Sequence, residues 1–158
     1  MDITNIFIAI IFVFFLVIIS ITDIRSGMIY NKILLPMAVI AIIFDFFDCL
    51  VSIDEAIFWA ILGGLLIYIV QIISHGGIGG GDVKFAFVLG FWLGEGILTT
   101  LFLSTIFASL AGILILIKKK NLKIAIPFGP FISLGALLTF FFKSQLINFY
   151  DNLFKNCL

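Results

Sequence analysis

Charged side chains are scarce in this sequence of 158 residues: Asp, Glu, Lys and Arg together make up 11%, against 63% hydrophobic residues. A soluble domain usually carries about 25% charged residues, which cover its exterior. With a mean hydropathy of +1.34, this composition excludes a soluble globular protein. Nine basic residues balance nine acidic ones, which argues against a nucleic-acid-binding protein, and we expect no nucleic acid among the partners.

Cysteine and histidine are nearly absent, with two and one residues respectively. Cys49 and Cys157 are far apart and form no CxxC pair, so we interpret them as two membrane-buried thiols rather than a disulfide or a zinc ribbon. Because His75 has no second histidine, an HExxH zinc site is impossible. The glycines of residues 76–81 lack the spacing of a P-loop or a dinucleotide-binding motif. We therefore expect no metal and no cofactor.

Long apolar runs fill most of the chain. A transmembrane helix needs about 20 apolar residues, so six helices would use about 120 positions. We predict an all-α polytopic membrane protein, a bundle of about six transmembrane helices with a short fourth helix, forming one membrane-embedded domain over residues 1–158. The first run has no basic n-region and no small-residue cleavage site, so we interpret it as a retained span. The predicted spans are residues 5–22, 33–50, 56–74, 83–94, 97–117 and 126–142.

The basic residues predict the orientation of these spans, because Lys and Arg beside short loops favour the cytoplasm. The lysines of residues 118–123 form the largest cluster, and Gly94-Glu95-Gly96 is a predicted turn between the fourth and fifth spans. Trp59 and Trp92 then fall near the outer boundary, where amphipathic rings collect. The cations expected inside are Arg25, Lys32, Lys84, Lys118, Lys119, Lys120 and Lys123, which leaves Lys143 and Lys155 outside.

Two carboxylates, Asp23 and Asp82, remain on the inner side. Acids at a bilayer are costly, and each is a functional candidate by default. Held close together, two carboxyl groups share a proton, and one acts as base while the other acts as acid. Alternatively, Asp23 pairs with Arg25 or is solvated by headgroups, and Asp82 is an N-cap. The acids expected outside or at its edge are Asp2, Asp45, Asp48, Asp54, Glu55, Glu95 and Asp151.

Glycine occupies five of the six positions 76–81, directly before Asp82. Glycine permits positive φ and lets a backbone approach another chain closely. This run is either part of a site or a flexible inner loop. The two inner carboxylates could also bind or relay a cation, which would make the chain a small six-span transport subunit.

Four segments resemble the type IV prepilin peptidases, a family of membrane-embedded aspartic proteases. Gly79-Gly80-Gly81-Asp82-Val83-Lys84 resembles the family's GxGDxK motif. The segment from Asp23 to Asn31 is similar to its first motif, an aspartate followed by Ile-Pro-Asn, although Tyr30 stands where the family usually has proline. Residues 89–94 and 127–131 also resemble bacterial members. The order and spacing agree over about residues 6 to 142.

The resemblance implies that Asp23 and Asp82 are the catalytic pair of an aspartic endopeptidase in the cytoplasmic membrane, with its site toward the cytoplasm. Its implied partners are membrane lipid and a type IV prepilin or pseudopilin precursor, cut after a short basic leader. The cysteine-rich N-terminal extension of many bacterial members has no counterpart here, so we expect cleavage without N-methylation. Residues expected to bind substrate or support the site are Asn31, Gly79, Gly81, Lys84, Pro127, Gly129 and Pro130.

Two of these assignments leave alternatives open. Lys84 stabilises an ionised carboxylate, meets an acidic group of the substrate, or anchors its span by reaching the lipid phosphates. Anchoring is the interpretation that we favour. Pro127, Gly129 and Pro130 open the last span near the site, or they simply begin a helix after the lysine cluster.

Overall fold

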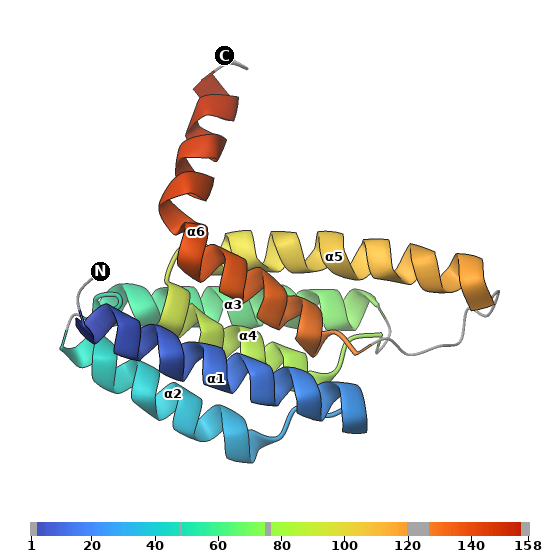
Figure 1. Ribbon diagram of the computed structural model, residues 1–158, viewed down its shortest axis with the longest axis horizontal. Helices are drawn as coiled ribbons and strands as arrows, with labels where there is room; N and C mark the ends of the chain where they lie inside the picture. Colours follow the sequence, from blue (N-terminus) through green and yellow to red (C-terminus); the bar gives the residue numbers. More distant parts are fainter. Residues whose placement is uncertain (1–2, 48, 75–76, 120–126, 156–158) are drawn as a thin grey trace.

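The computed structural model describes residues 3–47, 49–74, 77–119 and 127–155. Within these residues the secondary structure is entirely helical, which confirms the predicted all-α class, and Figure 1 shows the helices lying largely side by side. The helices are α1 (Ile3–Ser26), α2 (Asn31–Phe46), α3 (Ile53–Ile73), α4 (Gly80–Leu93), α5 (Gly96–Lys119) and α6 (Gly129–Lys155).

Three helices are long and apolar enough to cross a membrane: α1, α3 and the part of α5 from Gly96 to Ile115. The predicted short fourth helix is confirmed, since α4 has 14 residues, or about 21 Å at 1.5 Å per residue. The apolar part of α6 ends at Phe142, where φ of −115° and ψ of 16° kink the helix. Beyond this kink α6 turns away from the other helices (Figure 1).

α4 lies at the centre of the bundle and packs against α2, α3, α5 and α6. Nine of its 14 residues are buried. Small residues let α3 approach closely, because a Cβ at Gly90 would overlap the backbone of Trp59 and Ala60. A Cβ at Gly63 would likewise lie 3.2 Å from the Ala86 carbonyl oxygen. Close backbone contact through small residues is the usual packing mode of helices in lipid.

Trp92, near the end of α4, is buried among neighbouring helices. Its ring is 2% exposed and stacks on Phe12 at 4.9 Å between centroids, with Phe44 at its edge. The indole Nε1 donates to the Met37 carbonyl oxygen at 3.1 Å. Neighbouring helices therefore enclose the ring and supply its polar partner, so Trp92 packs inside the bundle. Trp59, in contrast, is only partly buried.

At the end of the bundle where α2 and α4 finish, particular residues shape the connections between helices. Gly94, in the predicted turn between α4 and α5, has φ of +56°, which favours glycine. Asp45, expected at the outer edge, is 1% exposed, and its Oδ1 accepts the Val51 N–H at 3.3 Å. Cys49, expected to be a membrane-buried thiol, is a free and exposed cysteine between α2 and α3, whereas Cys157 lies outside the described residues.

Candidate functional site

Asp23 lies one turn before the end of α1. Gly27 terminates this helix with φ of +63°, and its N–H donates to the Asp23 carbonyl oxygen at 2.8 Å. A glycine in this left-handed conformation is a common helix C-terminus. The Asp23 side chain is 5% exposed, so the sequence of the turn places a buried carboxyl group close to the end of the bundle.

The start of α6 holds the Asp23 carboxylate. The Gly129 N–H donates to Asp23 Oδ2 at 2.9 Å across 106 residues of sequence. The first N–H groups of a helix have no partner within the helix, so they readily bind a carboxylate. A Cβ at position 129 would lie 2.7 Å from the same oxygen. Glycine at this position therefore provides both the donor and the space, whereas the predicted ion pair with Arg25 is not what holds Asp23 Oδ2.

Asp82 is the third residue of α4, which begins three residues earlier than predicted. Gly79 is the N-cap, its N–H donates to Asp82 Oδ2 at 3.1 Å, and its carbonyl oxygen accepts the Asp82 N–H at 3.1 Å. The suggestion that Asp82 is itself the N-cap is therefore wrong. The side chain is 7% exposed, and its Oδ1 is buried without a hydrogen-bond partner among the described residues. One oxygen is thus fixed and the other is free.

The two aspartates lie at the same end of the bundle. The end of α1 and the start of α4 meet there (Figure 1), and the two carboxyl groups are close enough for the charge of one to affect the other. Neighbouring carboxyl groups can share one proton, so that one serves as base and the other as acid. Within the described residues, no cluster of three His, Cys, Asp or Glu side chains could hold a metal ion.

The glycines before Asp82 serve close packing, and those described do not use positive φ. Gly79 has φ of −75°, and Gly80 and Gly81 form the first turn of α4. A Cβ at Gly81 would lie 3.0 Å from the Ile29 Cβ, whereas one at Gly80 would meet only the end of the Gln71 side chain at 3.8 Å. His75 and Gly76 lie outside the described residues.

Asn31 and Lys84, both predicted as supporting residues, contact each other. Lys84 Nζ donates to Asn31 Oδ1 at 3.2 Å, and both side chains are exposed. This contact joins α4 to the first residue of α2, next to the site. Tyr30 caps α2 with φ of −81°, close to the value near −65° that proline fixes. The turn therefore keeps the conformation of a proline without having one.

Pro127 precedes α6, and Pro130 is its second residue. Proline is tolerated in the first turn because its missing N–H would have no partner within the helix. Of this predicted group, Gly129 is the residue that contacts Asp23. The segment therefore begins a helix, and its Gly129 N–H contacts Asp23, whereas the opening of the last span stays a prediction. Gly27 and Ile29 were not predicted, although a glycine at the end of an apolar run is a known helix stop signal.

Comparison with known proteins identifies relatives of the chain. The type IV leader peptidase family matches residues 10–117, which include both aspartates. The chain is 32% identical over 151 residues to a prepilin leader peptidase/N-methyltransferase of Bacillus subtilis, covering 92% of this chain and 60% of that protein. It is 27% identical over 138 residues to the protein of the same name from Pseudomonas aeruginosa, covering 83% of this chain and 48% of the relative.

The chain thus spans about half to three fifths of the length of these relatives. No solved structure matches it. The family match covers more than half of the chain, and three helices are able to cross a membrane. The chain is therefore a multi-pass membrane protein that belongs to the type IV leader peptidase family.

Proposed function

We propose that this chain is a membrane aspartic endopeptidase that removes the short basic leader from type IV prepilin-like precursors, using Asp23 and Asp82. The observation that carries the proposal is the buried carboxyl pair at one end of the bundle, in which each residue has one oxygen held by a backbone N–H. The relatives' names, which include prepilin leader peptidase, support the substrate class.

The proposed reaction needs one ionised and one protonated carboxyl group. The ionised group accepts a proton from water while the water oxygen bonds to the scissile carbonyl carbon. The protonated group donates to the carbonyl oxygen, and a proton then passes to the departing amine as the carbon–nitrogen bond breaks. The Gly79 and Gly129 N–H groups fix one oxygen of each carboxyl group, and Asp82 Oδ1, which has no partner among the described residues, is available for proton transfer.

The proposal also places the chain in the cytoplasmic membrane, with the site on its cytoplasmic side. The support is the charge pattern, because Arg25, Lys32 and Lys84 belong to the same end of the helices as the two aspartates and basic residues favour the cytoplasmic side. In a substrate with a basic leader and a hydrophobic helix, the bond between these two parts would then lie at the same membrane depth as Asp23 and Asp82. The one-domain organisation and cleavage without N-methylation are parts of the same proposal.

The test is cleavage of a synthetic prepilin by the purified chain in liposomes. Asp23→Asn and Asp82→Asn keep side-chain volume but remove an acid or base, so each should lower kcat by about 10²–10⁴-fold. Asp54→Asn, at an exposed acid in the first turn of α3, is the matched control and should cleave normally. Normal processing by both site variants would refute the proposal. Ion flux without aspartate-dependent cleavage would instead favour the ion-relay alternative.

A further inference from the structure

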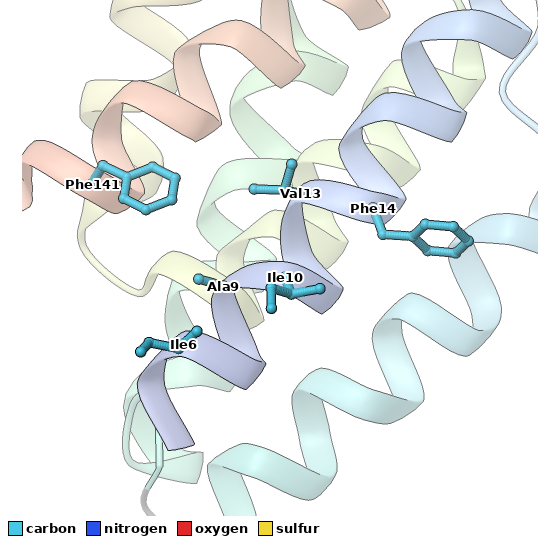
Figure 2. A pocket seen from close by; sticks show the side chains of 6 residues that line it. All are labelled: Ile6, Ala9, Ile10, Val13, Phe14 and Phe141. Atoms are coloured by element: carbon cyan, nitrogen blue, oxygen red, sulfur yellow. The ribbon is translucent and has the colours of Figure 1, made fainter. Parts of the chain in front are cut away.

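Two hollows follow one after the other along the contact between α1 and α6. The one farther from Asp23 has a volume of about 500 Å³ and is lined by Ile6, Ala9, Ile10, Val13, Phe14 and Phe141. Figure 2 shows Phe141 of α6 across from Ala9 and Val13 of α1. A second hollow, of about 230 Å³, lies along the same two helices and is lined in part by Val17, Ser20, Pro130, Ser133 and Leu137. We call the two hollows together the α1–α6 groove.

The two hollows share one face of each helix, because their lining residues recur at the three- and four-residue spacing of a helix face. On α1 this spacing links Val13, Val17 and Ser20, and on α6 it links Leu137 to Phe141. From Ile6 to Ile21 the groove follows α1 for about 24 Å at 1.5 Å per residue. This length approaches the thickness of the hydrocarbon layer of a bilayer, about 30 Å.

The second hollow forms the end of the groove that lies next to Asp23. Pro130 in its wall directly follows Gly129, the residue that binds Asp23. Ser20 and Ile21, on the α1 side, lie within one turn of Asp23. A chain lying in the groove would therefore enter the site without crossing another helix.

One buried polar group in the groove is without a partner. Ser133 is 5% exposed and lines the second hollow, and its Oγ forms no hydrogen bond among the described residues. Buried hydroxyl groups are nearly always hydrogen-bonded, so the Ser133 hydroxyl has an unused capacity to bond a polar atom that enters the hollow. An acyl chain has no such atom, whereas an extended peptide has an N–H and a carbonyl at each residue.

We propose that the α1–α6 groove holds the hydrophobic helix that follows the scissile bond of the substrate, and that Ser133 hydrogen-bonds the extended backbone beside the cut. This inference rests on the proposed function. A hollow of about 460 Å³ between α3 and α4 also reaches the site, through Val83 and Lys84. Its lining covers only residues 61–68 and 83–88, about 12 Å of helix at 1.5 Å per residue, whereas the two α1–α6 hollows in series extend over about twice that length.

Disulfide trapping distinguishes the two grooves. In a Cys49→Ser and Cys157→Ser background, Asp82→Asn keeps the substrate uncleaved, and Val13→Cys places a thiol in the α1–α6 groove. The substrate carries one cysteine about ten residues after the cut, which matches the ~15 Å from Asp23 to Val13 along α1. Phe87→Cys, in the α3–α4 hollow, is the matched control. We expect oxidation in liposomes to join substrate to Val13→Cys and not to Phe87→Cys.

The other outcomes are separable. A disulfide at Phe87→Cys alone, or at neither position, would overturn the groove assignment if the cysteine-free chain with intact aspartates still cleaves the substrate. Failure of that cysteine-free chain to cleave would refute the proposed function, and the inference with it. If the cysteine-free chain cleaves the substrate but no disulfide forms at either position, the result indicates that lipid, and not the substrate, occupies the groove.

Ser133→Ala provides an independent measurement. Loss of one hydrogen bond to bound substrate should raise KM about fivefold and leave kcat unchanged. Thr139→Val is the control, because Thr139 is also buried with an unpartnered hydroxyl but does not line the groove. An equal rise in KM for both variants, or none for Ser133→Ala, would contradict the role of Ser133.

Discussion

At the scale of single residues, the site depends on backbone donors more than on side chains. Asp23 and Asp82 are each held by the N–H of a glycine, Gly129 and Gly79 respectively. A backbone donor cannot rotate away as a side chain can, so the carboxyl groups are positioned by the helices that carry the glycines. The glycine N–H donors therefore satisfy one oxygen of each buried carboxyl group without a charged side-chain partner.

Gly129→Ala tests this positioning. The added Cβ would lie 2.7 Å from Asp23 Oδ2, so the carboxyl group must move and the shared geometry is lost. We expect kcat to fall by about 10²-fold, the effect of a misplacement of about 1 Å, while KM for a prepilin stays near its original value. Steady-state kinetics in liposomes measure both constants.

Gly80→Ala is the control for the same substitution near the same site. Its Cβ would meet only the flexible end of the Gln71 side chain at 3.8 Å, an ordinary contact. Activity close to that of the unchanged chain is expected. Equal losses for Gly80→Ala and Gly129→Ala would show that the glycine effect is unrelated to the Asp23 carboxylate.

At the scale of elements, the apolar runs predict the helices because lipid requires every backbone polar group to be paired within its own segment. Boundaries are less predictable. α4 begins at Gly80 rather than residue 83 because the Gly79 cap and Asp82 complete a first helical turn. α6 continues to Lys155, past the end of its apolar run, because its kink at Phe142 changes direction without ending the helix.

The packing of elements was beyond prediction from the sequence. Charge asymmetry isolates Asp23 and Asp82, since they are the only acids assigned to the inner side. Nothing local to Asp23 indicates that Gly129 binds it, because the two residues are 106 positions apart. Trp92 shows the same limit. Nothing in its sequence neighbourhood indicates that Met37 and Phe12 on other helices enclose its ring.

Gly90→Ala tests the contact between α3 and α4. A Cβ at this position would overlap the backbone of Ala60, and backbone cannot yield as a side chain can. Overpacking of this kind costs about 1–3 kcal/mol of folding free energy. We expect a lower Tm in detergent than for Gly64→Ala, whose Cβ would face mainly the Phe87 side chain at 3.2 Å. A Tm for Gly90→Ala equal to that of the unchanged chain would be inconsistent with such close packing.

At the scale of the whole molecule, the alternating direction of six helices places Cys49 and the candidate site at opposite ends. If the basic residues face the cytoplasm, the exposed Cys49 thiol faces outward. A membrane-impermeant maleimide should label it in intact cells that express a Cys157→Ser chain. Ser26→Cys, exposed beside the site, should be labelled only after permeabilisation when Cys49 is replaced by serine. The reverse pattern would invert the orientation.

The bond between Gly129 and Asp23 joins the last helix to the first, which has a consequence for biogenesis. During synthesis both aspartates enter the membrane with α1 and α4, well before α6 leaves the ribosome. Until α6 docks, the pair has its chemical groups but lacks the donor that fixes one of them. The Asp23 carboxyl group therefore gains its backbone donor only when α6 docks against α1.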